Sequence, residues 1–407
     1  MKPKGIFGRL KSALWTAAIT LLFAAPAGAQ TGLTLYNFTG QGDGENPLSS
    51  LVMDGHGNLY GTTFVGGAHG AGEVFELSPG GNGWTETVLY SFSGGLDGAD
   101  PFYADVILDA EGNLYGTTAE GGTFNQGVVF KLSSTGSGWS ESVLYSFAGG
   151  ADGAQPYAGL VFDPAGNLYG TTSSGGVFGA GTVFELTPDT DGEWIETVIH
   201  TFNRKDGEGP IGGLVLDKAG NIYGVTQGGG VNNSGAVFEL APSSSGHWTE
   251  KILHSFTGGA DGSYPYAERL IFDSLGNLYG TTNVGGAFNF GTVFSLSANA
   301  AGFWNERVLF SFEGNVAATP YSGLIIDAKG NLYGTCANGN GQTTVGAVFK
   351  LTPGVGGRWA EHNLHLFTRE DGEFPEAGLF GDKAGNLYGT TLLGGSSNAG
   401  VVFEIKP

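Results

Sequence analysis

The strongest constraint on this 407-residue chain is a unit of about 55 residues that occurs seven times. Its most regular part is the pentapeptide Gly-Asn-Leu/Ile-Tyr-Gly, which begins at Gly57, Gly112, Gly166, Gly220, Gly276, Gly330 and Gly385, at spacings of 54 to 56 residues. An aspartate stands three residues before each pentapeptide, and a Val-Phe pair follows it. A period of this length is typical of solenoids and propellers, in which each unit packs on the next.

Short apolar segments separated by turn residues predict four β-strands in each copy. In the second copy these segments are 106–109, 114–118, 127–132 and 139–147. The Gly-Asn pair between the first two segments tolerates the positive φ of a tight hairpin, and the last segment alternates with a period of two. No segment has a helical period. Four strands repeated seven times predict an all-β, seven-bladed β-propeller with four-stranded blades.

The two ends of the chain predict how the ring closes. Residues 33–38 resemble the end of a fourth strand but precede the first copy, whereas the seventh copy ends after its third strand at 401–405. We therefore expect the N-terminal strand to close the last blade as its outer strand, which removes an open sheet edge. The propeller then occupies residues 30–407 as a single domain. Cys336 is the only cysteine, so no intramolecular disulfide can hold the ring.

Residues 1–29 predict a Sec signal peptide rather than part of the fold. Lys2, Lys4, Arg9 and Lys11 precede an apolar stretch, and Ala27-Gly28-Ala29 offers a cleavage site. An uncleaved N-terminal anchor is the alternative. No later apolar run is long enough to span a membrane, and the chain ends at Pro407 without a hydrophobic tail. We expect a monomer that is secreted, periplasmic or at the cell surface, with no membrane span after cleavage.

Composition excludes several classes of protein. The 76 glycines follow no three-residue period, which excludes collagen, and a hydrophobic content of 40% argues against disorder. The formal charge is −21, and loss of the four cations before residue 30 gives −21 − 4 = −25. Such a charge repels phosphates, so we expect no nucleic-acid partner.

The string D-x-x-G-N-L-Y-G-T-T, followed by G-G and then G-x-V-F-x-L, resembles the Gloeo/Verruco (GloVer) tandem repeat of bacterial exported proteins. All seven copies carry it, with small departures such as Cys336 in place of a threonine. The resemblance implies a β-propeller-like surface or secreted protein. Family members carry various C-terminal anchors, and we expect none here because no such segment precedes Pro407; the family implies no catalytic residues.

The Gly-x-Asp-Gly loops between copies supply a possible cation site. A ring of their carboxylates could hold Ca²⁺, which prefers several hard oxygen ligands. The alternative is that each Asp-Gly builds a turn and its carboxylate bonds to the local backbone. No EF-hand-type loop occurs, and no other cofactor is expected. The candidate ligands are Asp43, Asp97, Asp152, Asp206, Asp261 and Asp371.

Differences between copies indicate a candidate ligand site at the mouth of the channel. The interval from the loop proline to the next repeat aspartate is seven residues in five copies but eight in copies 2 and 5. The extra residue predicts a β-bulge that re-aims side chains, whereas other copies have small residues at this level. Aromatic residues also follow several of the prolines. The candidate ligand-binding residues are Phe102, Tyr103, Asp105, Tyr157, Tyr266, Glu268, Arg269 and Tyr321.

Three functions fit this pattern. The leading one is non-catalytic binding of an extracellular glycan, peptide or protein by an aromatic rim with a few ionisable groups. The alternative is a carbohydrate- or lactone-active enzyme in which Asp105 and Glu268 act as acid and base. The separation of the two carboxyl groups would decide whether they can act as such a pair. In the third, the chain is a structural scaffold of the envelope or surface, and the copy-specific residues only adjust packing.

Overall fold

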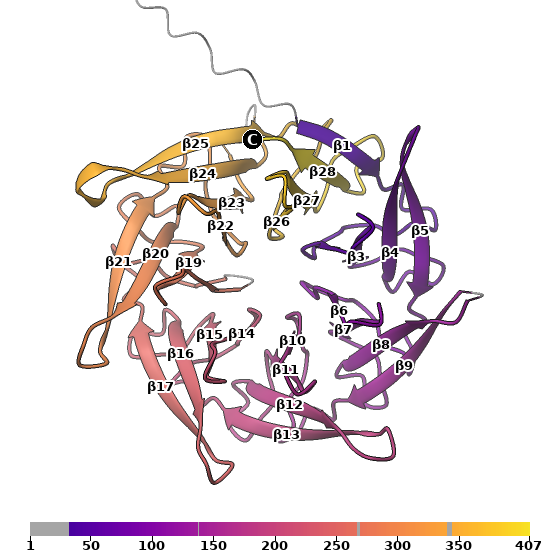
Figure 1. Ribbon diagram of the computed structural model, residues 1–407, viewed down its shortest axis with the longest axis horizontal. Coiled ribbons are helices and arrows are strands. Elements are labelled where there is room, and N and C mark those ends of the chain that lie inside the picture. Colours follow the sequence, from indigo (N-terminus) through magenta and orange to yellow (C-terminus); the bar gives the residue numbers. More distant parts are fainter. Residues whose placement is uncertain (1–31, 137, 267–268, 340–343) are drawn as a thin grey trace, which may run out of the picture.

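The computed structural model describes residues 32–136, 138–266, 269–339 and 344–407. These residues form seven four-stranded antiparallel sheets that follow one another around a ring (Figure 1). The prediction of an all-β, seven-bladed propeller is therefore confirmed. Within the same ranges, the only helical element is a single 3₁₀ turn, Val355–Gly357, and no helix is long and apolar enough to cross a bilayer.

We number the blades by the copy that each contains. Blade 1 comprises β2 (Val52–Met53), β3 (Leu59–Thr63), β4 (Glu73–Gly80) and β5 (Gly83–Ser91), and blade 2 comprises β6 (Ile107–Leu108), β7 (Leu114–Thr118), β8 (Val128–Ser134) and β9 (Trp139–Ser146). Blade 3 comprises β10 (Val161–Phe162), β11 (Leu168–Thr172), β12 (Thr182–Pro188) and β13 (Trp194–Thr201), and blade 4 comprises β14 (Val215–Leu216), β15 (Ile222–Thr226), β16 (Ala236–Pro242) and β17 (Trp248–Ser255). Blade 5 comprises β18 (Ile271–Phe272), β19 (Leu278–Thr282), β20 (Thr292–Ala298) and β21 (Trp304–Ser311), and blade 6 comprises β22 (Ile325–Ile326), β23 (Leu332–Cys336), β24 (Ala347–Pro353) and β25 (Trp359–Leu366). Blade 7 comprises β26 (Phe380–Gly381), β27 (Leu387–Thr391), β28 (Val401–Ile405) and β1 (Gly32–Asn37).

The pentapeptide forms the first hairpin of each blade and the strand that follows it. In blade 2 the Asp109 carboxylate accepts hydrogen bonds from the backbone N–H groups of Glu111 and Asn113 and from the Asn113 side chain. Gly112 takes a φ of +83° in this turn, which an L side chain rarely adopts. The glycine of the strand has a different role, because a Cβ at Gly116 would lie 2.6 Å from the ring of Phe130. The repeat aspartates are thus structural.

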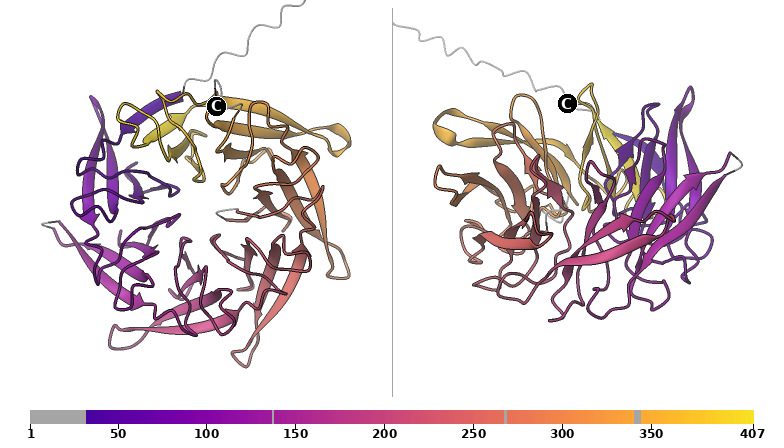
Figure 2. Two further views of the ribbon diagram at one scale, coloured as in Figure 1. Left: turned by 180° about the vertical axis from the view of Figure 1, so that it is seen from behind. Right: turned by 60° about the horizontal axis from the view of Figure 1, so that its bottom comes forward.

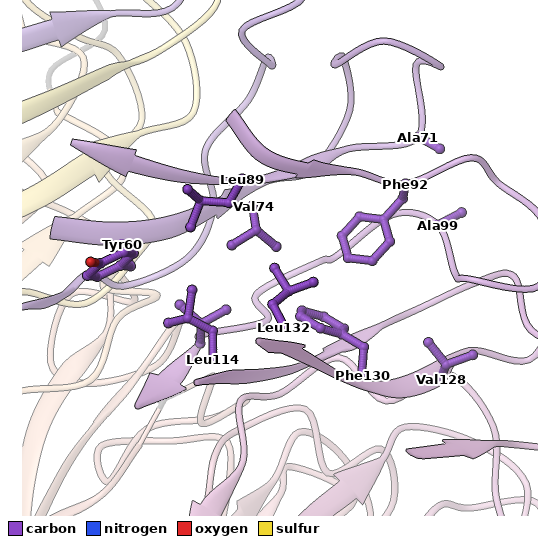
Figure 3. Close-up of a cluster of buried hydrophobic side chains, with 11 residues drawn as sticks. Tyr60, Ala71, Val74, Leu89, Phe92, Ala99, Leu114, Val128, Phe130 and Leu132 are labelled. Carbon is purple, nitrogen blue, oxygen red and sulfur yellow. The ribbon is translucent and has the colours of Figure 1, made fainter. Parts of the chain in front are cut away.

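The core lies between blades, as Figure 3 shows for blades 1 and 2. Tyr60, Val74 and Leu89 of blade 1 pack against Leu114 and Phe130 of blade 2, with the remaining side chains of this cluster around them. The Trp-x-Glu tryptophans also join neighbouring blades, since each described Trp–Tyr ring pair links an outer strand to the second strand of the blade before it. The ring pairs are Trp84–Tyr388, Trp194–Tyr115, Trp248–Tyr169 and Trp304–Tyr223.

Blade 7 is closed by the N-terminal strand, as the sequence predicted. Strand β1 pairs antiparallel with β28, from Gly32 opposite Ile405 to Asn37 opposite Val401. Figure 1 shows the indigo β1 beside the yellow β28. Phe38, which follows β1, is fully buried and packs edge-to-face on Phe75 of blade 1. Strand pairing and core packing therefore both hold β1 in the ring.

One face of the ring, which we call the top face, carries both the loops that link blades and the loops between the second and third strands. Isolated β-bridges join these two kinds of loop, for example Ala99 to Glu120 and Ala154 to Ser174. The hairpins that contain Gly-Asn lie at the opposite end of the second strand. Figure 2 shows the ring from behind and in a tilted view, in which the loops extend beyond the strands at both ends.

Candidate functional site

The mouth of the channel on the top face is built by the loop that links each blade to the next. The residue before each loop proline has a left-handed backbone, with φ of +55° at Asp100 and +53° at Thr319. The N–H of Asp100 donates to Ala71 O of the preceding blade at 2.9 Å, which fixes the loop against its neighbour. The chain then enters the channel, so the residues after the prolines surround the mouth. They are Leu48, Phe102, Tyr157, Ile211, Tyr266, Tyr321 and Glu376.

Half-buried aromatic rings gather in two groups at this mouth. Phe102 packs edge-to-face on Tyr103 at 4.5 Å between ring centroids, and on both Tyr157 and Phe64 at 5.1 Å. On blades 5 and 6, Tyr266 and Tyr321 form a second pair at 5.1 Å. The aromatic candidates predicted from sequence thus lie at the mouth in two groups, which we call the aromatic rim.

A polar side chain faces each aromatic group. The Tyr103 hydroxyl donates to Glu376 Oε2 at 2.7 Å, a contact that reaches from blade 2 to blade 7. The Gln227 side-chain amide donates to the Tyr266 hydroxyl. Burial, the Glu376 carboxylate and the neighbouring tyrosine hydroxyls raise the pKa of Tyr103 well above its usual value. Burial also raises the pKa of Glu376, although the hydrogen bond from Tyr103 opposes that rise.

The extra residue of blade 2 is accommodated in a turn ahead of the innermost strand. Tyr103 has a φ of +49°, and the N–H of Asp105 donates back to its carbonyl oxygen at 3.2 Å. Strand β6 keeps the two-residue length of β2, so the irregularity lies before the strand and not within it. A left-handed tyrosine costs of order 1–2 kcal/mol, a strain that the packing and the Glu376 contact offset.

Asp105 and Arg269 occupy equivalent positions deeper in the channel, beyond the rim. Asp105 Oδ1 accepts the N–H of Ser50 at 2.6 Å, so this carboxylate ties blade 2 to blade 1. The backbone of Arg269 forms a bridge with Gly213, and a Cβ at Gly323 would lie 2.9 Å from its carbonyl oxygen. Small residues in the flanking blades therefore make room for these two. Both line a cavity of about 270 Å³ together with aliphatic side chains. Glu268 lies outside the described residues.

The six linker aspartates each serve their own loop. Asp43 accepts hydrogen bonds from the Tyr36 hydroxyl and from the backbone and hydroxyl of Thr39, at 2.6 to 2.9 Å. Histidines replace the tyrosine in three blades, as in the 2.9 Å contact between His365 Nε2 and Asp371. Among the described residues, no group of three or more metal-ligating side chains comes together. The calcium site stays a prediction that this geometry does not favour.

Sequence reasoning missed Glu376 and Gln227. Glu376 had a visible signal, because it is the one carboxylate among the seven residues that follow the loop prolines. Gln227 stands in the loop after the second strand, where the copies vary freely and no pattern marks it. Glu120, in the equivalent loop of blade 2, contributes after burial to the raised pKa values of Asp100 and Tyr157.

These features define an all-β propeller of seven blades with an aromatic, carboxylate-bearing mouth. The chain belongs to the Gloeobacter/Verrucomicrobia repeat family, whose model matches residues 20–161, 136–343 and 215–407. A comparison with curated proteins finds no match.

Two solved structures resemble the chain in fold. PorZ, an essential bacterial surface component of the type-IX secretion system of Porphyromonas gingivalis, has 16% identity and a TM-score of 0.54 over 91% of this chain. This chain spans 47% of PorZ. A candidate 6-phosphogluconolactonase from Bacteroides uniformis has 15% identity and a TM-score of 0.51, with 82% of this chain and 88% of the other covered. At these identities the likeness concerns the fold alone.

Proposed function

We propose that this chain is an exported binding protein that holds a saccharide at the top-face mouth without altering it. The observation that carries the proposal is the aromatic rim, in which half-buried rings from four blades lie beside hydrogen-bonding groups. A sugar ring presents apolar C–H faces together with hydroxyls, and binding sites for such ligands combine stacking surfaces with a few placed polar groups.

Export is part of the proposal. It is supported by the pattern of residues 1–29, where a basic segment, an apolar stretch and small residues follow one another. The fold likeness to PorZ, itself a surface component, is compatible with the same location. Peptide or protein ligands at the same mouth remain the alternatives within this class of function.

Catalysis is the less supported function. Glycoside hydrolysis requires two carboxyl groups at a defined separation, one as acid and the other as base or nucleophile. Of the two predicted candidates, Asp105 is engaged with the backbone of Ser50 at 2.6 Å, and Glu268 lies outside the described residues. Enzymatic activity at the mouth therefore stays a prediction, and no reaction is proposed.

A glycan screen followed by calorimetry tests the binding function. We expect Tyr266→Ala and Tyr321→Ala each to weaken the bound glycan roughly 10-fold, because loss of an aromatic contact removes about 1.4 kcal/mol. Phe303→Ala is a matched control, since Phe303 is also an aromatic residue, 69% exposed, but lies in the outer hairpin between β20 and β21. Unchanged affinity in the double tyrosine variant, at an unchanged melting temperature, would refute a site at the mouth.

A further inference from the structure

We propose that the saccharide bound at this mouth carries a free amino group, whose ammonium lies between the Tyr266–Tyr321 pair and the Glu376 carboxylate. This inference rests on the proposed function and specifies the ligand class. It is carried by three independent features: the tyrosine rings, the position of the carboxylate and the charge of the whole molecule.

The first feature is the pair of tyrosine rings. Tyr266 and Tyr321 pack edge-to-face at 5.1 Å and are both half-buried, so part of each ring remains accessible from the mouth. The face of an aromatic ring is negative, and cations are attracted to it within about 6 Å. The Tyr266 hydroxyl is held by Gln227, which fixes the ring before any ligand arrives.

The second feature is the Glu376 carboxylate. Glu376 follows its loop proline just as Tyr266 and Tyr321 follow theirs, and it belongs to the blade next to that of Tyr321. Its charge also helps to raise the pKa of Tyr103, after burial, and that of Tyr266, after burial and Tyr321. Tyr103 donates to Oε2, and no described residue donates to Oε1. An ammonium can therefore bond to Oε1 while the Tyr103 contact persists, and such charge-assisted hydrogen bonds are stronger than neutral ones.

The third feature is charge. With a formal charge of −21, the molecule attracts cations and repels anionic polymers such as uronate glycans. Asp105 and Arg269 both line the cavity beyond the rim, so their opposite charges offset each other and give a cation no net attraction at that depth. The ammonium is therefore placed at the rim, and the sugar chain extends outward across the top face.

Matched oligosaccharides of equal length test the inference by calorimetry at about pH 6, where the amines of a glucosamine oligomer are mostly protonated. One is a glucosamine oligomer, and the other is the same oligomer with every amine acetylated. We expect the free-amine form to bind roughly 10-fold more tightly and to lose affinity as salt rises from about 50 to about 300 mM.

Glu376→Gln separates charge from shape, because the amide oxygen still accepts the Tyr103 hydroxyl. We expect this variant to lose most of the preference for the free-amine oligomer, because only the cation–π attraction of the tyrosine pair remains. Asp191→Asn removes one exposed carboxylate from the hairpin between β12 and β13, away from the mouth, and should preserve the preference.

Each result decides one of the two proposals. Equal or tighter binding of the acetylated oligomer, still weakened by Tyr266→Ala, would overturn the amine inference and leave saccharide binding in place. A lysine-containing peptide that binds more tightly than either oligomer would overturn the saccharide ligand itself. Oligomer binding that is insensitive to both Tyr266→Ala and Glu376→Gln would overturn the site at the mouth.

Discussion

At the scale of single residues, Glu73 departs most clearly from the repeat. It begins β4, where the other copies have valine, threonine or alanine, and its side chain is 0% exposed. Neither carboxyl oxygen has a hydrogen-bond partner among the described residues. Burial, followed by the nearby Glu86 and Asp43 carboxylates, raises the pKa of Glu73 to about 9. The residue is therefore protonated at neutral pH and leaves a buried polar group unsatisfied, which costs about 1–3 kcal/mol.

Glu73→Thr should stabilise the protein. In blades 3 and 5 a threonine at this position pairs its hydroxyl with the threonine across the sheet at 2.8 Å, and Thr63 is available to do so in blade 1. We expect a gain of about 1–3 kcal/mol in the free energy of unfolding at neutral pH. The folded pKa of Glu73 lies above the unfolded one, so the wild type loses stability as pH rises from about 4.5 to about 9 and the advantage of the variant grows.

Urea unfolding at about pH 6, 7.5 and 9 measures this difference. Val128→Thr is the control, because it places a threonine opposite Thr118 at the equivalent buried position of blade 2 without removing a carboxyl group. A Glu73→Thr variant that is less stable than the wild type at pH 9 would contradict the assignment of Glu73 as a destabilising acid.

At the scale of elements, the repeat sequence predicted those parts of the structure that every blade shares. The hairpins, the interblade tryptophans and the closing role of β1 follow from local sequence, because each strand resembles its counterparts. The contact from Tyr103 to Glu376 could not be predicted in this way. It joins residues 273 positions apart, and whether two side chains meet across the channel depends on the radius of the ring and the turn ahead of β6.

Strand β1 is expected to be essential to the ring. Deletion of residues 30–38 removes its pairing with β28 and the buried Phe38 ring, so blade 7 loses its outer strand and β28 becomes an exposed edge. We expect a marked fall in melting temperature and a tendency to self-associate. A synthetic peptide of residues 30–38 should restore much of the lost stability by adding the strand back, whereas a peptide of the same composition in scrambled order should not. An unchanged melting temperature on deletion would contradict the closure.

At the scale of the whole molecule, the seams between blades repeat one pair of carboxyl groups. In blades 1 to 5 the Trp-x-Glu glutamate of the outer strand interacts electrostatically with the linker aspartate of the same seam, and one of its oxygens is buried without a partner among the described residues. In blade 6 the corresponding Glu361 interacts with Glu313 instead. Burial and then the aspartate raise the pKa to about 7 in five half-buried glutamates. They are Glu86, Glu141, Glu196, Glu250 and Glu306. The aspartates of three of these seams move the other way, because hydrogen bonds outweigh burial and lower the pKa of Asp43, Asp97 and Asp261.

The ring should therefore be more stable in mildly acidic than in alkaline solution. Each of the five glutamates is protonated in the folded state up to about pH 7 but ionises at about 4.5 when unfolded, so stability falls as pH rises between these values. His200 and His254 act in the opposite direction, because burial lowers their pKa and stability falls as pH drops through 6.5 and below. The five glutamates outweigh the two histidines, and we expect the melting temperature to be higher at about pH 5.5 than at about pH 8.

Replacing the five glutamates with glutamine should make the melting temperature less dependent on pH. The effect is reduced by solvent screening, since each side chain is only half-buried. A melting temperature that rises from pH 5.5 to pH 8 in the wild type would show that these glutamates are ionised in the folded ring, and that burial and the linker aspartates do not hold them neutral.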